Sequence, residues 1–300
     1  MKSEFDFIEK IRRTAQPKHA KIGIGDDCAV VPKDAKTDLV ITTDLLVEDV
    51  DFRLDWATPE LIGGKALSVS LSDIAAMGAG PVWAMLSLGI PEKIWRSDFL
   101  DNFYRGWFNA ARKFGVELVG GDVSKTPDKI VIDSIVAGQV KKNKAILRSG
   151  AKPGDLIFVS GELGGAAGGL KLLEIGIRLE KAKFWQKNLI YKQLSPDLKV
   201  SEAKEFGENQ IPSAMIDLSD GLSSDLAHIC RASQIGAKIF AAKIPFHKNL
   251  RSLTKSFDEQ LDLALNGGED FELLFTVSPK KNFRLQKAGK SFPFHHIGEA

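Results

Sequence analysis

The sequence predicts a two-domain fold in which helices and strands are mixed. Its 300 residues, 44% of them hydrophobic, are enough to bury a sizeable core. Short apolar runs rich in β-branched residues, typical of buried strands, alternate with longer segments of helical periodicity. The polar segment 149–155, which contains proline and glycine, interrupts this alternation near the middle of the chain. We therefore expect one domain at residues 1–148 and a second at residues 149–300.

Charge and cysteine content exclude several classes of protein. The 41 basic and 39 acidic residues nearly cancel, and no basic stripe typical of nucleic-acid binding is present in the sequence. No run approaches the roughly 18 apolar residues of a membrane span, and residues 1–6 contain no apolar signal region. The two cysteines, Cys28 and Cys230, have apolar neighbours, which fits reduced thiols. We expect a cytoplasmic protein that binds neither nucleic acid nor membrane.

Two helices organise the first half. A short amphipathic segment with Phe5, Ile8 and Ile11 precedes them and is interpreted as a packing element. Thr58-Pro59 is a strong helix start, because threonine caps the helix and proline suits its first position. Small residues in this helix predict close approach to a neighbouring backbone, and its Asp73 is a costly charge unless it is paired or bound to metal. The second helix is expected from residue 97 to 115, and strands are expected at 29–31, 39–43, 82–90, 116–119 and 130–140.

The second half continues the alternation. After a strand at 156–159 comes the glycine-rich segment 161–169, which matches neither the P-loop nor the dinucleotide pattern. A phosphate site on helix N–H groups and close helix packing are both open interpretations of this segment. The remaining expected elements are a helix at 223–233 closed by Gly236, a helix at 261–265, a strand at 271–277, and a helix from Lys280 to Gly289.

Carboxylates recur directly after apolar runs or glycines. A single Gly-Asp-Asp turn or Thr-Asp pair is more often structural, because aspartate bonds its own backbone or caps a helix. Six such places in one chain favour a shared site. Their donors are oxygens, without histidine or cysteine at metal spacing, and this set suits Mg²⁺ rather than zinc. The six stretches are 25–31, 42–44, 69–73, 118–122, 216–220 and 267–270.

The carboxylate pattern indicates chemistry on a polyphosphate. Phosphoryl transfer depends on positioning and charge neutralisation, which carboxylate-bound Mg²⁺ supplies. The sequence contains no Walker A motif, no kinase glycine-rich loop and no H-R-D motif, so an ATP site must be of another kind. No serine, cysteine or histidine has an activating partner motif, so we expect direct transfer without a covalent intermediate.

Seven motifs resemble the thiamine-monophosphate kinase family, in its order and spacing over nearly the whole chain. The resemblance implies a member of the aminoimidazole-ribonucleotide-synthetase-like superfamily, with an α+β N-terminal domain whose sheet pairs into a dimeric barrel and a C-terminal α/β domain packed on it. It further implies a homodimer that uses ATP to phosphorylate thiamine phosphate to thiamine diphosphate. The motifs are Gly23-Ile24-Gly25-Asp26-Asp27-Cys28-Ala29, Thr42-Thr43-Asp44, Lys65-Ala66-Leu67 through Leu71-Ser72-Asp73 to Gly78, Gly120-Gly121-Asp122, residues 148–155, Ile216-Asp217-Leu218-Ser219-Asp220-Gly221-Leu222, and Gly267-Gly268-Glu269-Asp270-Phe271-Glu272-Leu273.

The resemblance also implies site residues. Glu269 is expected on the thiamine-phosphate side, together with Asp51, which stands where many family members have a histidine. The family pattern continues to a C-terminal aromatic residue that lies on the substrate, whereas this sequence stops at Ala300; either it is a shortened piece or that wall is missing. The implied ATP contacts are Tyr104, Gly121, Asp122, Arg148 and Ser219, and the implied Mg²⁺ ligands are Asp27, Thr42, Thr43, Asp44, Asp73, Asp122, Asp217 and Asp220.

Two other functions stay open at this point. A relative of the same superfamily that activates an amide or a selenide would keep the carboxylates and change the acceptor, although Glu269 and its neighbours argue against it. A non-catalytic nucleotide or metal sensor is the second alternative. ADP release measured with and without thiamine phosphate separates these functions.

Overall fold

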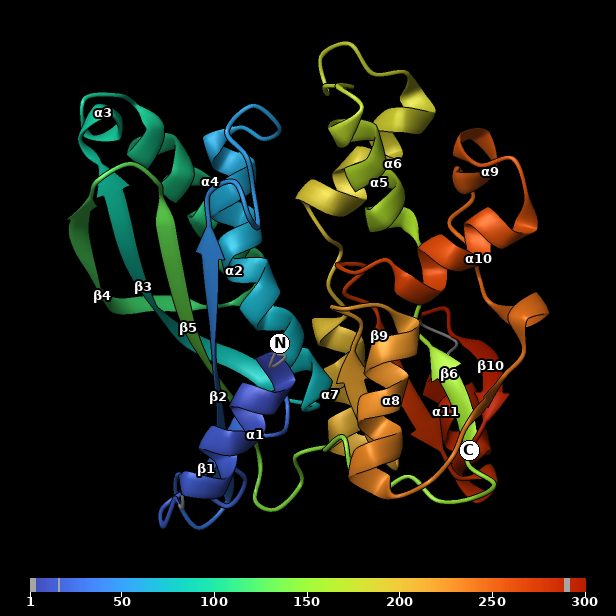
Figure 1. The fold of residues 1–300 in the computed structure, drawn as a ribbon. Helices are drawn as coiled ribbons and strands as arrows, with labels where there is room; N and C mark the ends of the chain where they lie inside the picture. The colour runs from blue at the N-terminus through green and yellow to red at the C-terminus, as the bar shows by residue number, and fades with distance from the viewer. Residues whose placement is uncertain (1–3, 16, 289–291) are drawn as a thin grey trace.

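A computed structural model describes residues 4–15, 17–288 and 292–300. The described chain forms a two-domain α+β fold with two five-stranded sheets, one in each half (Figure 1). Neither sheet closes into a barrel within the described residues. Among those residues, none of the helices combines the length and the apolar character needed to cross a membrane.

The N-terminal sheet has the strand order β1-β2-β5-β3-β4. All its pairs are antiparallel except β3 with β4, which is parallel. Helices α2 and α4 pack against each other and against one face of this sheet (Figure 1). The elements of this half are α1 (Glu4–Thr14), β1 (Ala29–Pro32), β2 (Thr37–Val47), α2 (Pro59–Ala76), β3 (Gly80–Pro91), α3 (Glu92–Trp95), α4 (Phe99–Phe114), β4 (Glu117–Thr126) and β5 (Val131–Lys141).

The C-terminal sheet has the order β7-β9-β6-β10-β8, and all its pairs are antiparallel. The expected α/β class for this half is therefore corrected to α+β, because strands consecutive in the chain do not pair through parallel crossovers. The elements are β6 (Leu156–Val159), α5 (Gly165–Glu174), α6 (Phe184–Leu194), α7 (Val200–Asn209), β7 (Ala214–Asp217), α8 (Leu222–Ser233), β8 (Lys238–Ile239), η1 (Ala241–Lys243), α9 (Leu250–Leu253), α10 (Phe257–Asn266), β9 (Leu273–Val277), η2 (Pro279–Lys281), α11 (Asn282–Ala288) and β10 (His295–Glu299).

Helix α2 runs between the two halves and contacts both of them. Its start is as predicted: Thr58 accepts a hydrogen bond from the Leu61 amide and Pro59 is the first helical residue. The predicted close backbone approach is confirmed, because a Cβ on Gly63 would lie 2.0 Å from the carbonyl oxygen of Phe103 in α4. This tight crossing leaves the opposite side of α2 free to face the C-terminal half.

Several expected element ends are corrected. Residues 120–122 lie inside β4 rather than after a strand, because β4 continues its parallel pairing with β3 as far as Thr126. Helix α8 ends at Ser233 as predicted, but the residue that closes it is Gln234 in the left-handed conformation (φ 56°) and not Gly236. The glycine expected to close the last helix, Gly289, lies outside the described residues. Ile8 and Ile11 of α1 are exposed, which corrects the packing predicted for these two residues, whereas the side chain of Phe5 lies outside the described part of the chain.

Gly207 brings α7 against the turn that follows α2. A Cβ on Gly207 would lie 2.1 Å from the carbonyl oxygen of Gly78. We expect Gly207→Ala to lower the free energy of unfolding by about 2 kcal/mol or more, because the backbones must move apart. Alanine ordinarily stabilises a helix by about 1 kcal/mol over glycine, so the sign of the change is diagnostic.

Urea unfolding measures this difference. Gly236→Ala is the matched control, because nothing lies within 4 Å of its added Cβ. We expect that control to stay within about 0.5 kcal/mol of wild type. A Gly207→Ala protein as stable as wild type would show that the two backbones do not need this close contact.

Candidate functional site

Three of the predicted carboxylates meet in one cluster at the junction of the two halves. Asp27 comes from the Gly-Asp-Asp turn before β1, Asp73 from α2 and Asp217 from the end of β7. One carboxylate oxygen of each lies within 4.8 Å of the others. The Oδ2 atom of Asp27 is buried without a hydrogen-bond partner among the described residues. Carboxylates this close repel one another, so the cluster is suited to a cation.

The raised pKa values of these carboxyl groups show that their ionised forms are unfavourable in this arrangement. Burial raises the pKa of Asp73 well above its usual value, and the charges of Asp217, Asp44 and Asp27 raise it further. Burial and the neighbouring Asp27 likewise raise the pKa of Asp217. Burial also raises the pKa of Asp26, to about 7, with Asp27 as the second cause. A bound cation would relieve this repulsion and favour the ionised forms.

Hydroxyl groups orient the cluster from α2 and β2. Thr42 donates to Asp73 at 2.5 Å, and Ser72 donates to Asp217 at 2.6 Å. Asp44 accepts a hydrogen bond from Ser70 at 2.7 Å, on the same face of β2 as Thr42. These bonds are short and all run to carboxylate oxygens, so they fix the orientation of the ligand groups.

Thr43 does not join this cluster. Because side chains alternate along a strand, Thr43 projects from the opposite face of β2, where it donates to Asp133 of β5 at 2.6 Å. The structure thus places the predicted ligands Thr42 and Thr43 on two different faces of the sheet.

Arg148 binds the cluster from the link between the two halves. Its Nε and Nη2 atoms donate to Oδ1 of Asp27 at 3.0 and 2.6 Å, and its backbone amide donates to Asp26. The side chain of Arg148 is about one-fifth exposed. A cation beside a carboxylate cluster, with donors still available, is placed to contact an anionic group brought there.

The loop after Asp217 carries Ser219 and Asp220. Asp225 of α8 accepts hydrogen bonds from the backbone amides of Asp220 and Gly221 at 3.2 and 3.1 Å. Burial, and then Asp220, raises the pKa of Asp225 to about 7. Asp220 itself is exposed and follows Asp217 by three residues, so this loop carries a solvent-accessible carboxylate next to a member of the cluster in the chain.

Tyr104, Gly121 and Asp122 line a separate open pocket of about 430 Å³ between α4 and β4. Gly121 packs on β3 so closely that a Cβ there would lie 1.9 Å from the carbonyl oxygen of Leu86. The register places Gly121 across β3 and β5 from Asp44, which is three strand spacings or about 14 Å. A single copy of the chain therefore does not bring Asp122 to the carboxylate cluster.

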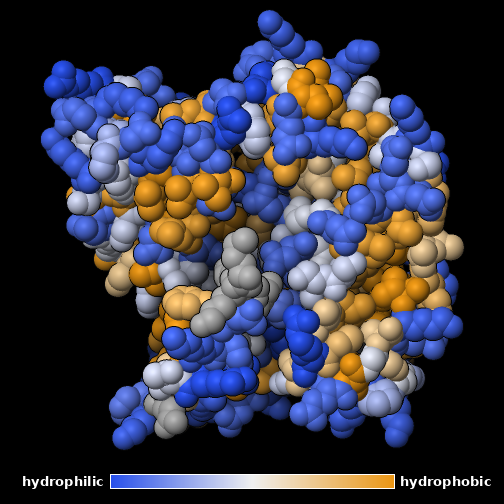
Figure 2. Space-filling model, in the orientation of Figure 1, coloured by the Kyte–Doolittle hydropathy of each residue, from blue (hydrophilic) through white to orange (hydrophobic). Residues whose placement is uncertain are grey.

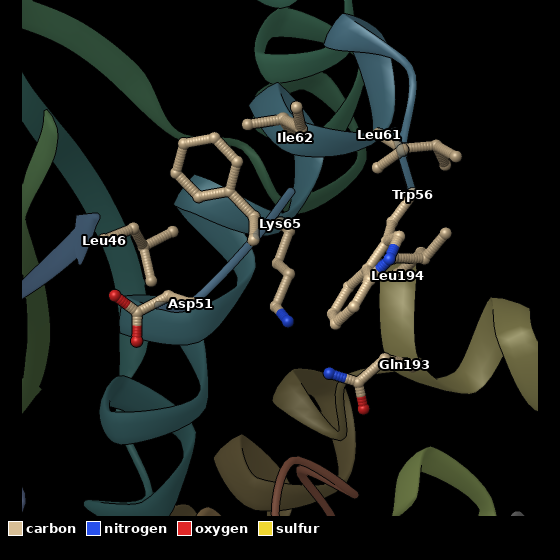
Figure 3. A pocket seen from close by; sticks show the side chains of 10 residues that line it. Leu46, Asp51, Trp56, Leu61, Ile62, Lys65, Gln193 and Leu194 are labelled. Atoms are coloured by element: carbon tan, nitrogen blue, oxygen red, sulfur yellow. The ribbon is translucent and has the colours of Figure 1, made fainter. Parts of the chain in front are cut away.

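Asp51 and Glu269 belong to a third region. Asp51 lines a pocket with Trp56, Lys65 and Gln193, and it also accepts a hydrogen bond from the Val47 amide at 2.8 Å (Figure 3). Lys65 and Gln193 both bind the carboxylate of Glu269. The two residues implied for thiamine phosphate thus share the surroundings of one pocket.

Sequence reasoning missed several polar groups at these sites. Ser70 and Ser72 lie within the stretch 69–73, but nothing in that stretch indicated that they orient carboxylates. Lys65 carries the same signal that singled out Asp73, a charge within an apolar helix, and so could have been found. Asp225 could not, because its role depends on a loop that folds back on α8.

Asp270 anchors the acidic segment beside Glu269. Its buried carboxylate accepts from the amides of Gly164 and Ala166 at 2.6 and 3.0 Å, at the start of α5. The residues on either side, Glu269 and Phe271, have positive φ angles of 64° and 49°. Such backbone persists where surrounding contacts over-determine it. Burial raises the pKa of Asp270 to about 7.

This shift predicts a pH-dependent stability. The folded pKa lies above the unfolded value near about 3.9, so the folded state binds more protons between these values. The stability that Asp270 contributes is complete below about pH 4 and is lost as the pH rises toward about 7. We expect the free energy of unfolding of Asp270→Asn, relative to that of wild type, to rise by up to about 3 kcal/mol between pH 5 and pH 8. Urea unfolding at both values measures this, and a constant difference would contradict it.

Comparison with known proteins follows the same division of the chain. The family described as AIR synthase related protein matches with its N-terminal domain at residues 25–140 and with its C-terminal domain at residues 152–300. Thiamine-monophosphate kinase of Bacillus subtilis is 38% identical over 276 residues, covering 92% of this chain and 83% of that protein. The enzyme of Buchnera aphidicola is 42% identical over 296 residues, covering 97% and 88%.

Solved structures agree with these relatives. The structure "AaThiL complexed with AMPPCP and TMP" matches with a TM-score of 0.86 at 33% identity, covering 99% of this chain and 90% of that one. Thiamine-monophosphate kinase from Stenotrophomonas maltophilia matches with a TM-score of 0.82 at 36% identity, covering 99% and 93%. Sequence and fold agree over nearly the whole chain, and this chain therefore belongs to the thiamine-monophosphate kinase family.

Proposed function

We propose that this chain transfers the γ-phosphoryl group of ATP directly to the phosphate of thiamine phosphate, giving thiamine diphosphate. The three-carboxylate cluster with its unpartnered Asp27 oxygen is the observation that carries the proposal. A relative of the same fold is described with an ATP analogue and TMP. Phosphoryl transfer between two anions requires charge neutralisation at one place, and this cluster is built for a cation.

The residues present fit Mg²⁺. All donors of the cluster are carboxylate oxygens, and one buried oxygen lacks a partner among the described residues. Bound Mg²⁺ would neutralise phosphate charge. Asp27, Asp73 and Asp217 would hold the metal, and Thr42 and Ser72 keep two of these carboxylates in place. Further ligands proposed from the family pattern are Asp44 and Asp220. The same pattern implies Thr43 and Asp122, which do not lie at this cluster within a single copy of the chain.

The chain's own residues orient the two substrates. We assign the nucleotide contacts to Tyr104, Gly121, Asp122, Arg148 and Ser219, and the acceptor contacts to Asp51 and Glu269. The acceptor oxygen is already an ionised phosphate oxygen, so a strong general base is unnecessary. Burial raises the pKa of Cys28 well above its usual value, which leaves that thiol protonated and unsuited to attack.

The decisive experiment measures ADP release with thiamine phosphate, with thiamine, and with neither acceptor. We expect release that depends on Mg²⁺ and on thiamine phosphate. Release that is independent of thiamine phosphate would favour another acceptor, and ATP binding without any release would favour a sensor. A phosphoenzyme that passes its label to thiamine phosphate at a competent rate would overturn direct transfer.

Tyr104 tests the nucleotide pocket. Its ring lies beside Gly121 and Asp122, and it also makes an edge contact with Phe103. We expect Tyr104→Ala to raise the KM for ATP several-fold more than the KM for thiamine phosphate, because a stacking surface for the base is lost. Equal changes in both constants would assign Tyr104 to the helix core alone.

A homodimer is the proposed assembly, with a dimeric barrel formed on the outer face of the N-terminal sheet. That face, turned away from α2 and α4, exposes large apolar side chains such as Leu45, Met85 and Val119. Figure 2 shows hydrophobic residues over the half of the molecule where Figure 1 places β5 and β2. Exposed apolar area of this kind marks an interaction surface. Light scattering should give twice the chain mass at micromolar concentration, and Leu45→Lys should shift it toward the monomer.

We also propose that the boundary between the two domains lies near residue 149. We propose a cytoplasmic location as well. Cys28 and Cys230 are both unpaired thiols, which fits a reducing compartment. Limited proteolysis that cuts first within residues 149–155 would support the boundary, and cell fractionation tests the location.

A further inference from the structure

Lys65 is the basic residue of α2, and it is almost completely buried, with 3% of its surface exposed. Its ammonium lies 2.8 and 3.0 Å from the two carboxylate oxygens of Glu269, across the junction of the two halves. The amide of Gln193 in α6 donates to the same carboxylate. Figure 3 shows the ammonium of Lys65 directed into the pocket between Asp51 and Trp56. Lys65 and Gln193 therefore line the pocket and both hold the carboxylate of Glu269.

The backbone of Glu269 is held by specific contacts, as its side chain is. Its amide donates to the carbonyl of Ser219 at 2.8 Å, and its φ angle of 64° is unfavourable for glutamate. A Cβ on the preceding Gly268 would lie 2.4 Å from the same carbonyl oxygen of Ser219. The backbone of Glu269 is thus hydrogen-bonded to the loop that carries Asp217. Its unfavourable φ angle persists because these contacts, and the contact of its carboxylate with Lys65, fix the residue in place.

Helix α2 contacts both of these linked segments, the one that carries Glu269 and the one that carries Asp217. Lys65 and Ser72 are seven residues apart, so they lie on the same face of the helix, separated by about 10 Å. Lys65 binds Glu269, and Ser72 donates to Asp217 at 2.6 Å. One rigid face of α2 therefore sets the distance between the carboxylate at the pocket and the carboxylate at the cluster.

Stability alone does not account for a buried ion pair at this place. Removing two charges from water is unfavourable, and apolar residues of similar volume often replace such pairs without loss of stability. The side chain of Glu269 stays 29% exposed while that of Lys65 is 4% exposed. The pair thus holds one partly exposed carboxylate beside two residues that line the pocket, which is a requirement of a binding site rather than of a core.

We propose that Lys65 is a positioning residue for the acceptor substrate: it holds Glu269 at a fixed distance from Asp217, so that thiamine phosphate reaches from Glu269 to the carboxylate cluster. The inference rests on the proposed function, in which Glu269 contacts the acceptor. The thiazolium ring of that substrate is cationic, and a carboxylate held in one orientation is a suitable partner for it. Lys65 acts through Glu269 and makes no contact with substrate of its own.

The test is a double-mutant cycle with Lys65→Met and Glu269→Gln, which remove the charges with little change in volume. We expect Lys65→Met to raise the KM for thiamine phosphate at least ten-fold and to leave the KM for ATP within two-fold. Adding Lys65→Met to Glu269→Gln should change the KM for thiamine phosphate less than two-fold, because Lys65 then has no carboxylate to hold.

Lys21→Met is the matched control. Lys21 binds both oxygens of the buried Asp38 at 2.8 and 2.7 Å, as Lys65 binds Glu269, but this pair is not part of the pocket or the carboxylate cluster. We expect it to lower the melting temperature and to leave both KM values unchanged. If Lys65→Met does not fold, Gln193→Met removes the other donor to Glu269 and should raise the KM for thiamine phosphate selectively.

Two results would overturn the inference. Additive effects in the double mutant would show that Lys65 contacts the substrate itself. Equal changes in both KM values, or a loss of melting temperature alone, would show that the pair is only structural. Failure of the proposed function is distinct from both, because the wild-type protein would then release no ADP in response to thiamine phosphate.

Discussion

Asp73→Asn is expected to lower kcat at least about a hundred-fold while raising the melting temperature of the metal-free protein. Asp73 is packed against Asp27 and Asp217, with carboxylate oxygens within 4.8 Å. Burial and three neighbouring carboxylates raise its pKa, so its charge destabilises the folded protein when no cation is bound. Asparagine keeps the volume and an acceptor for Thr42, and it removes the charge. Stability and activity should therefore change in opposite directions.

Thermal melting with and without Mg²⁺ completes this test. Mg²⁺ should raise the melting temperature of wild type, because a ligand that binds only the folded state stabilises it, and should raise that of Asp73→Asn less. Asp258→Asn, at an exposed position in α10, is the control and should leave kcat unchanged. If Asp73→Asn retains full turnover, the cluster does not hold the catalytic metal. If it loses stability instead, Asp73 is a structural residue of α2.

Arg148→Met is expected to raise the KM for ATP at least about ten-fold and to lower the stability of the metal-free protein by about 3 kcal/mol or more. Arg148 makes two hydrogen bonds to Oδ1 of Asp27, whose other oxygen is already unpartnered among the described residues. Removing the guanidinium leaves a buried carboxylate without compensation. It also removes the cation that we assign to the phosphates of ATP.

Arg148→Lys separates these two effects. Lysine restores the charge beside Asp27 and lacks the planar fork, so stability should largely return while the KM for ATP stays raised. Urea unfolding and steady-state kinetics on the two variants measure both quantities. An unchanged KM for ATP in Arg148→Met would assign Arg148 to the stability of the domain link alone.

Local patterns predicted most of the elements, because they depend on contacts close in the chain. The strand at 156–159 was predicted with the bounds that the structure has, and the cap at Thr58 was predicted from a threonine followed by proline. Errors fall where pairing partners decide the outcome. The glycines at 120–121 indicate a loop by composition, yet pairing with β3 keeps them in β4. The C-terminal sheet is antiparallel, which no local pattern shows.

The same division holds for the candidate site. The sequence by itself determined the chemistry available: oxygen donors after apolar runs, no activated nucleophile, and an order of motifs that resembles one kinase family. Only the tertiary structure decided which donors meet. It brings Asp27, Asp73 and Asp217 together, and it places Thr43 on the far face of β2 and Asp122 three strands away.

Lys65 and Glu269 show the physical reason. They lie 204 residues apart in the chain, and the residues next to each in the sequence do not indicate that the two side chains pair. Their pairing depends on how α2 packs between the two sheets, and that packing is set by the summed burial of many side chains rather than by any local sequence. Residue types determine what a site is able to bind, whereas the packing of distant segments determines where its groups stand.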